Sequence, residues 1–162
     1  MKKRMGWFVM AAILLALALV FLSRFLSPPF SAAEDEIALE IQLDVREDIG
    51  LLIIDYAAGD VECSGGVSNA DKSLLKHDER LVFTIDRRHF ADPAALENLR
   101  IRFRIITAYE PPNYENIYTP EHTMALEEII LRAEYGKTYQ IIIRGGNAGG
   151  YQAVLAEPSP IP

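Results

Sequence analysis

Short stretches in which apolar and polar residues alternate are the feature that most limits what this chain can fold into. In residues 39–45, Leu39, Ile41, Leu43 and Val45 alternate with charged or amide side chains. Because successive side chains of a strand point to opposite faces of a sheet, this pattern predicts a strand with one solvated face. The more continuously apolar residues 51–56 predict a second strand, one that lies inside a sheet.

Alternation also predicts several later strands. They lie at residues 81–85, 101–105, 127–135, 139–143 and 151–155, with a brief strand at 61–63. The start of segment 127–135 has helical propensity, but the alternation that follows favours a strand. The glycine-rich remainder of residues 57–73 predicts a loop. Asp92 before Pro93 predicts one or two helical turns, because aspartate caps helices and proline suits the first helical position.

Seven or eight short strands, one short helix and no internal repeat are typical of an all-β sandwich or barrel. The turn Tyr135-Gly136-Lys137-Thr138-Tyr139 resembles the E–F corner of immunoglobulin-like domains, in which a tyrosine hydroxyl bonds upstream backbone. Tyr139 is the candidate for that role. The resemblance covers residues 37–156 and implies an immunoglobulin-like antiparallel β-sandwich of a bacterial-type exported protein. It lacks the cysteine pair and core tryptophan of antibody domains, since Cys63 and Trp7 are the only residues of their types.

The N-terminus predicts export. Lys2, Lys3 and Arg4 precede 19 uncharged residues, Met5 to Ser23, that form a predicted hydrophobic helix. A cleaved signal peptide is one interpretation, supported by the small residues at 31–33. An uncleaved membrane anchor is the other, and the length slightly favours it, because spanning helices need about 18 apolar residues or more and signal cores about 7–15.

Both interpretations divide the chain in the same way. Residues 1–33 are the signal peptide or transmembrane anchor, 34–157 a β-sandwich domain, and 158–162 a Pro-rich tail with an extended backbone. The basic N-terminus is expected to stay in the cytoplasm. The domain is then expected outside it, held at the cell membrane by a single span or secreted.

Composition narrows the partners of the exported part. Beyond residue 33 there are 12 basic and 23 acidic side chains, a net charge of −11. Such a domain repels nucleic acid at long range, so we expect no nucleic-acid partner. A single cysteine excludes an internal disulfide. Cys63 is therefore either a half-buried apolar residue or half of an intermolecular disulfide.

Residues 109–123 are the candidate binding loop. The segment contains Tyr109, Tyr114 and Tyr118 together with three prolines. Tyrosine rings are flat and amphipathic and lose little entropy on binding, which suits a glycan or a protein partner. The alternative is that the tyrosines fold back as a lid over one end of the sandwich.

The sequence contains no motif for catalysis, and we predict neither a cofactor nor a metal. His77, His89 and His122 are far apart and lack metal-ligand spacing. A hydrolase would require His89 or His122 to approach a nucleophile in the folded chain. No Gly-x-Ser-x-Gly elbow and no phosphate-binding glycine loop occurs.

Two charged groups have alternative interpretations. Asp60, Glu62 and Asp71 flank the glycine-rich loop and offer oxygen ligands for calcium, but a solvated acidic surface is the simpler interpretation. The alternating Arg100, Arg102 and Arg104 offer an anion or partner surface. The simpler expectation is that they pair across the sheet with Glu40 and Asp44.

Together these features predict a non-enzymatic binding or assembly module, membrane-anchored or secreted, outside the cytoplasm. The alternative is a structural subunit of an envelope complex that pairs through an edge strand, at residues 151–156 or 37–46.

Overall fold

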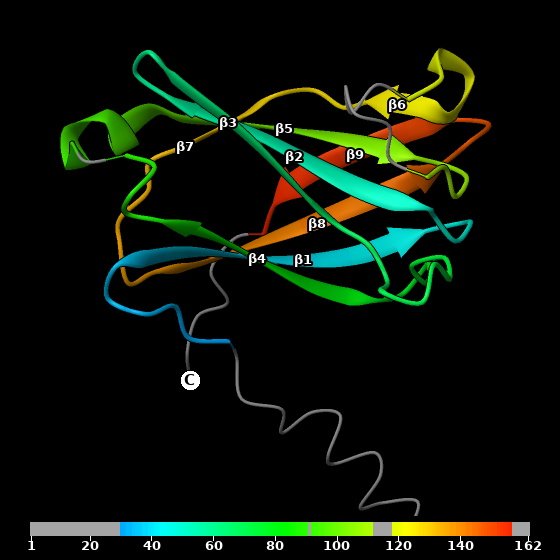
Figure 1. Cartoon of the computed structure of the whole chain (residues 1–162), viewed down its shortest axis with the longest axis horizontal. Coiled ribbons are helices and arrows are strands. Elements are labelled where there is room, and N and C mark those ends of the chain that lie inside the picture. The colour runs from blue at the N-terminus through cyan, green and yellow to red at the C-terminus, as the bar shows by residue number, and fades with distance from the viewer. Residues whose placement is uncertain (1–29, 91, 112–117, 157–162) are drawn as a thin grey trace, which may run out of the picture.

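The computed structural model describes residues 30–90, 92–111 and 118–156, and these form two facing β-sheets (Figure 1). In chain order the strands are β1 (Glu36–Val45), β2 (Leu51–Ala58), β3 (Val61–Val67), β4 (Arg80–Asp86), β5 (Leu99–Ile106), β6 (Thr123–Ala125), β7 (Ile129–Leu131), β8 (Thr138–Gly146) and β9 (Gly150–Leu155). Within the described residues the helices are two short 3-10 helices, η1 (Pro93–Asn98) and η2 (Pro120–His122). The predicted all-β fold is therefore confirmed.

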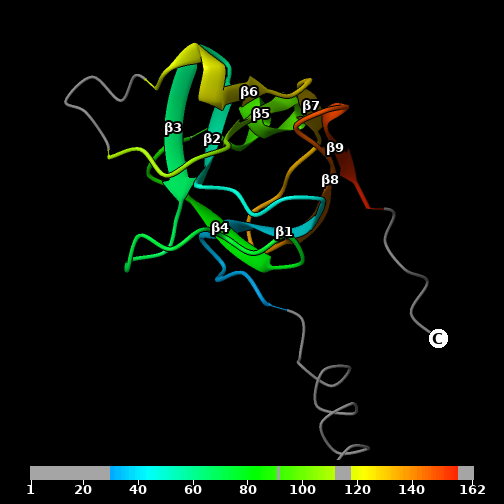
Figure 2. The ribbon, with the colours of Figure 1, turned by 90° about the vertical axis from the view of Figure 1, so that its right-hand side faces the viewer.

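The two sheets lie one on the other, as the view along the strands shows (Figure 2). One has the order β4-β1-β8-β9. The other has the order β3-β2-β5, and both β6 and β7 pair with the remaining edge of β5. The predicted interior position of residues 51–56 is confirmed, because β2 lies between β3 and β5.

The core lies between the sheets and consists of the apolar side of each alternating strand. Ile41 of β1, Phe103 of β5 and Ile143 of β8 are fully buried. The solvated side of β5 has Arg100, Arg102 and Arg104 in the intervening positions. The alternation therefore identified which side of β1, β5 and β8 faces the core, since burial of the apolar side is what stabilises the pair of sheets.

The predicted helical turn forms where Asp92 and Pro93 place it. The Asp92 carboxylate accepts a hydrogen bond from the amide of Ala94 at 2.9 Å and caps η1. Leu96 on this helix is buried. The turn therefore both connects the sheets and closes one end of the core.

One strand pair departs from the antiparallel arrangement that the sequence predicts. β1 and β8 run parallel, with Ala38 opposite Thr138 and Val45 opposite Gly145. The other pairings between named strands are antiparallel. Alternation specifies the two faces of a strand but not the direction of its neighbour. The immunoglobulin-like topology is thus not confirmed, and the finding is the broader one of an all-β fold with two sheets.

The predicted brief strand at residues 61–63 forms, but the loop predicted to follow it begins too early. β3 continues through Gly65 and Gly66 to Val67 and pairs with β2 along its length. A Cβ atom on Gly65 would lie 2.7 Å from the ring of Phe83 in the other sheet. Glycine here permits close approach of the two sheets rather than ending a strand.

The predicted single strand at 127–135 is also wrong, because only Ile129–Leu131 forms β7. The pairing along β5 explains the interruption. Arg104 lies opposite Ala125, but Ile101 lies opposite Ile129, so four residue steps on one side match three on the other. This shift is that of a β-bulge between β6 and β7.

Two tyrosines close the turn that leads into β8. As predicted for Tyr139, its hydroxyl bonds upstream backbone, accepting from the amide of Glu134 at 2.9 Å and donating to the carbonyl of Arg132 at 3.4 Å. The hydroxyl of Tyr135 donates to the carbonyl of Phe90 at 2.6 Å. Arg87 lies over the Tyr135 ring at 4.8 Å.

The sandwich has two distinct ends. We call the end where β1 and β8 begin the terminal end; there Thr138 donates to the carbonyl of Phe30 at 2.9 Å, and β9 runs back towards it. The distal end is the opposite one and includes Gly50, Lys72 and Tyr109. β1 alone separates the two ends by roughly 30 Å, at about 3.3 Å per residue.

The edge strands agree only partly with the prediction. β9 is an edge of its sheet, as expected for residues 151–156. Residues 37–46 are not an edge, because β1 lies between β4 and β8. Residues 1–29 and 157–162, which contain most of the predicted leader and all of the tail, lie outside the described residues. In the part that is described, no helix has the length and apolar character needed to cross a bilayer.

Candidate functional site

Two of the three candidate tyrosines, Tyr109 and Tyr118, lie at the distal end. Tyr109 follows the end of β5, and Tyr118 precedes η2. Both line one cavity of about 460 Å³, which we call the distal cavity. Tyr114 lies outside the described residues.

The distal cavity has both apolar and polar lining residues. The apolar contribution comes from Gly50, Leu51, Ala70, Tyr109, Pro111 and Tyr118, and the polar one from Ser68, Asn69, Lys72 and Glu110. These residues belong to three separate parts of the chain. They are the start of β2, the turn after β3 and the segment after β5.

Gly50 allows the first and last of these parts to touch. A Cβ atom at this position would lie 2.3 Å from the carbonyl oxygen of Ala108. The Gly50 amide donates to the carbonyl of Ile106 at 2.8 Å. The close approach brings Tyr109 against the beginning of β2 and so forms one wall of the cavity.

Glu110 holds the two described sides of the tyrosine segment together. Its carboxylate accepts hydrogen bonds from the Thr119 hydroxyl at 2.7 Å and from the Thr119 amide at 3.3 Å. These bonds lower the pKa of Glu110, the hydroxyl bond most. The side chain is therefore ionised at neutral pH and fixed in position.

The turn at residues 68–73 is ordered by its own side chains. Asn69 Nδ2 donates to the Ser73 hydroxyl and to the Leu74 carbonyl, both at 3.1 Å. Asp71 accepts from the amide and hydroxyl of Ser73. Lys72 has a φ of 67° and is the non-glycine residue with positive φ in the described ranges.

A second, lateral cavity of about 270 Å³ adjoins the first on the outer face of the five-stranded sheet. It is lined by Leu51, Ile53, Ser64, Gly65, Gly66, Arg104 and Tyr118. Leu51 and Tyr118 therefore belong to both cavities. Arg104 is held by Asp55 through two bonds of 2.7 and 2.9 Å. Burial would raise the pKa of Asp55, but hydrogen bonds from Arg104 and Ser64 outweigh it and lower the pKa.

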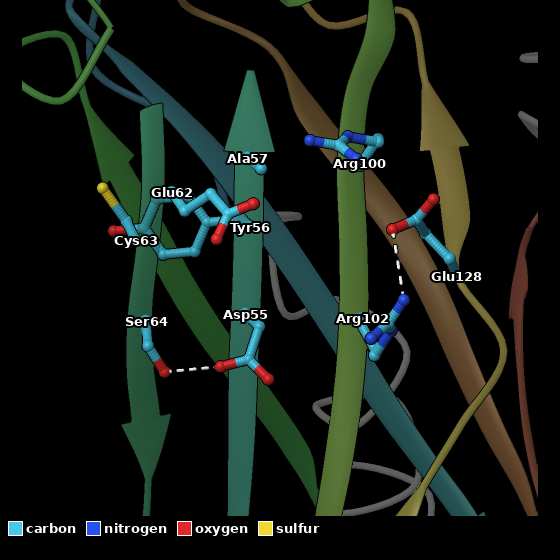
Figure 3. A pocket seen from close by; sticks show the side chains of 9 residues that line it. All are labelled: Asp55, Tyr56, Ala57, Glu62, Cys63, Ser64, Arg100, Arg102 and Glu128. Carbon is cyan, nitrogen blue, oxygen red and sulfur yellow. Dashed lines mark hydrogen bonds and ion pairs between the residues drawn. The ribbon is translucent and has the colours of Figure 1, made fainter. Parts of the chain in front are cut away.

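Further along this face lies a shallow charged depression of about 430 Å³ (Figure 3). Arg100 and Arg102 project from β5, and Asp55, Glu62 and Glu128 surround them. Arg102 reaches Glu128 at 3.6 Å. Glu128 lies at the bulge between β6 and β7, a placement that no local sequence signal indicated.

The predicted partners of the arginines are wrong. Arg104 and Arg102 pair with Asp55 and Glu128 on their own sheet. Glu40 instead pairs with Arg80 at 3.0 Å, and Asp44 pairs with Arg144 at 3.2 Å. The reason is topological, because β1 and β5 belong to different sheets and their solvated faces point away from each other.

The possible calcium ligands are not brought together. Asp60 and Glu62 lie at the start of β3, whereas Asp71 lies beyond its end and bonds Ser73. Among the described residues, no group of three histidine, cysteine, aspartate or glutamate side chains is placed to hold a metal ion.

The histidines contact groups that are poor nucleophiles. His89 Nδ1 lies 3.1 Å from the Tyr56 hydroxyl. Burial, reinforced by the neighbouring Cys63, raises the pKa of Tyr56 to about 12, so this hydroxyl stays protonated. His122 lies 3.7 Å from Glu121. Cys63 itself is half-buried against the core, as one of its two interpretations predicted.

The comparisons with known proteins leave the family open. No family model and no curated protein sequence matches the chain. A protein from Eubacterium rectale, solved by NMR, is 9% identical at a TM-score of 0.39, over 78% of this chain and 93% of that one. Pneumolysin is 11% identical at a TM-score of 0.35, over 77% and 24%. The membrane-binding domain of pneumolysin is 10% identical at a TM-score of 0.35, over 81% and 100%.

Proposed function

We propose that this chain is a non-enzymatic binding module, displayed outside the cytoplasm by an N-terminal anchor or released by cleavage of that segment. The observation that supports this most is the position of the distal cavity. Residues 30–35 lead into the terminal end, whereas Tyr109 and Tyr118 lie at the other end of the sandwich. A tether at the first end leaves the second free to meet a partner.

The distal cavity also has the chemistry of a binding site. Tyr109 is 39% exposed, and both Tyr109 and Tyr118 contribute to its walls. Rigid aromatic rings beside fixed polar groups are typical of sites that bind glycans, other small molecules or peptides. The finer assignment of an immunoglobulin-like sandwich is part of the same proposal, and the hydroxyl contacts of Tyr139 support it.

Cysteine labelling in intact cells tests the display of the distal end. In a Cys63→Ala background, Lys72→Cys is expected to react with a membrane-impermeant maleimide before the cells are lysed. Lys3→Cys in the same background is the matched control. It is expected to react only after lysis, or to be absent from the mature chain if the leader is cleaved. Labelling of Lys72→Cys only after lysis would contradict the proposal.

The second candidate is an envelope subunit that pairs through β9. This edge strand contains no charged residue, and Leu155 on it is 43% exposed. Uncharged edges are prone to pair with another strand. Because the Ala156 amide bonds Gln140 on β8 and the pattern alternates, the Ala153 amide points away from β8.

Ala153→Pro therefore removes an outward donor and leaves the β8 pairing in place. If β9 carries assembly, the full chain in detergent sediments as a larger species that this variant dissociates. A monomeric wild-type chain would argue against this candidate.

A further inference from the structure

We propose that the distal cavity binds a neutral, hydroxyl-rich oligosaccharide. The inference rests on the proposed function and names the ligand class of the same site. Three properties of the cavity support this inference: an apolar lining, hydrogen-bond acceptors held in position, and one positive and one negative side chain.

The apolar lining suits the C–H face of a sugar ring. Leu51, Pro111 and the rings of Tyr109 and Tyr118 contribute apolar surface to the cavity. A pyranose has one largely apolar face and a rim of hydroxyls. Aromatic side chains with a polar tip match such a ligand, because the ring contacts the C–H groups while the hydroxyl reaches the rim.

The acceptors distinguish a saccharide from a proline-rich peptide. The Glu110 carboxylate is held by Thr119 and keeps lone pairs for a ligand. The side-chain Nδ2 of Asn69 donates within its turn, so the side-chain oxygen Oδ1 of Asn69 is the atom that can accept from a ligand. Sugar hydroxyls donate to such acceptors, whereas a polyproline segment has few N–H groups and therefore few donors for the remaining lone pairs of Glu110.

The charges favour a neutral ligand. Lys72 and Glu110 are the ionised side chains that line the distal cavity, and their charges are opposite. Lys72 retains a long cationic side chain at a left-handed backbone position where glycine is sterically preferred. The net charge of −11 beyond residue 33 further disfavours a polyanion at long range.

The size and continuity of the cavities favour more than one sugar unit. The distal cavity of about 460 Å³ lies within the usual range of small-molecule sites, about 300–1,000 Å³. Tyr118 also lines the lateral cavity, towards Ser64 and Arg104. A second sugar unit that crosses Tyr118 would therefore reach a further polar surface.

Calorimetric titration of the purified full chain tests the proposal with cellohexaose, chitohexaose, maltohexaose and xylohexaose. We expect at least one to bind with a Kd of about 0.1–1 mM. Glu110→Gln keeps one oxygen, which can accept from the Thr119 hydroxyl, but it loses the charge and the second oxygen, which accepts from the Thr119 amide. It should weaken binding about tenfold or more. Glu121→Gln, on an exposed side chain outside both cavities, is the matched control and should bind as the wild type does.

Four results would overturn the proposal. They are no binding of any of the four up to about 10 mM, equal binding by Glu110→Gln and the wild type, tighter binding of hexagalacturonate, or binding of a proline-rich peptide that Tyr118→Ala removes. None of these four results contradicts the proposal that the module lies outside the cytoplasm, provided that Lys72→Cys is labelled in intact cells. Failure of that labelling would reject the display whatever the titration shows.

Discussion

Tyrosines at the two ends of the sandwich have different surroundings. At the terminal end, Tyr135 and Tyr139 bond backbone groups through their hydroxyls. At the distal end, Tyr109 and Tyr118 line a cavity formed by three separate parts of the chain. A hydroxyl that satisfies buried backbone contributes to folding, whereas a ring in a cavity wall is available to a ligand. The terminal end should therefore govern stability, and the distal end should govern binding.

The same contrast extends to the carboxylates. Asp86 at the terminal end is bonded by Arg88, and Asp48 at the distal end is bonded by Lys76 and His77. These contacts lower the pKa of both to about 2. Both ends therefore use exposed charged contacts to hold loops, so charge alone does not distinguish the terminal end from the distal end.

The largest expected loss of unfolding free energy comes from a substitution at Gly50, which would disrupt the packing of the distal end. Gly50→Ala forces a methyl group against the Ala108 carbonyl, so the variant should lose about 2–3 kcal/mol of unfolding free energy, as overpacked sites do. Gly149→Ala is the control, because no atom lies within 4 Å of its added Cβ. Urea denaturation of both variants measures the difference. Equal midpoints would mean that residues 107–109 move aside freely.

Tyr135→Phe tests the terminal end. The change removes the 2.6 Å bond to the Phe90 carbonyl and leaves a buried acceptor without its donor. We expect a loss of about 1–2 kcal/mol in unfolding free energy. Tyr109→Phe, the same change at the distal end, should cost less than about 0.5 kcal/mol. Comparable losses of unfolding free energy in the two variants would contradict the expectation that the tyrosines of the terminal end contribute more to stability than those of the distal end.

Lowering the pH should reduce the stability that Asp48 contributes at the distal end and Asp86 at the terminal end over the same pH range. The pKa of Asp48 is lowered from its ordinary value of 3.8 to about 2 by hydrogen bonds from Lys76 and His77. A carboxyl with a lower pKa in the folded than in the unfolded state stabilises the fold fully above pH 4. Its contribution is lost as the pH falls towards 2. Thermal midpoints between pH 6 and 2 should therefore fall less steeply for Asp48→Asn, which starts lower, than for the wild type.

A small effect on stability is expected when Tyr109, Tyr114 and Tyr118 all become alanine. The triple variant should lose ligand capture but less than about 1 kcal/mol of unfolding free energy, because the described rings line a cavity rather than the core. Circular dichroism melting and the saccharide titration measure the two quantities separately. If the triple variant unfolds, the loop is a structural lid, as its alternative interpretation holds.

The sequence predicted the strands better than it predicted their neighbours. Alternation identified the buried sides of β1, β5 and β8, and the Asp92 cap located η1. It failed at Gly65, where a glycine between the sheets resembles a loop residue, and at residues 127–135, where a bulge interrupts the pattern. Both failures depend on what lies opposite the residue, which a local pattern does not contain.

The candidate site shows the same division. The tyrosine content of residues 109–123 indicated a binding loop from sequence alone. That Lys72 and Asn69 share a cavity with Tyr109 depended on the pairing of β2 with β3 and β5. Likewise, Arg104 met Asp55 rather than Asp44 because its strand lies in the other sheet.

The sequence by itself determined which side of β1, β5 and β8 is buried, where one capped turn forms and which loop is rich in tyrosine, because each of these depends on residues close together in the chain. Only the tertiary structure decided that β1 and β8 run parallel and that Tyr109 and Tyr118 lie at the end opposite residue 30. Strand order, direction and register are set by contacts between residues far apart in the sequence. The position of the distal cavity follows from those contacts.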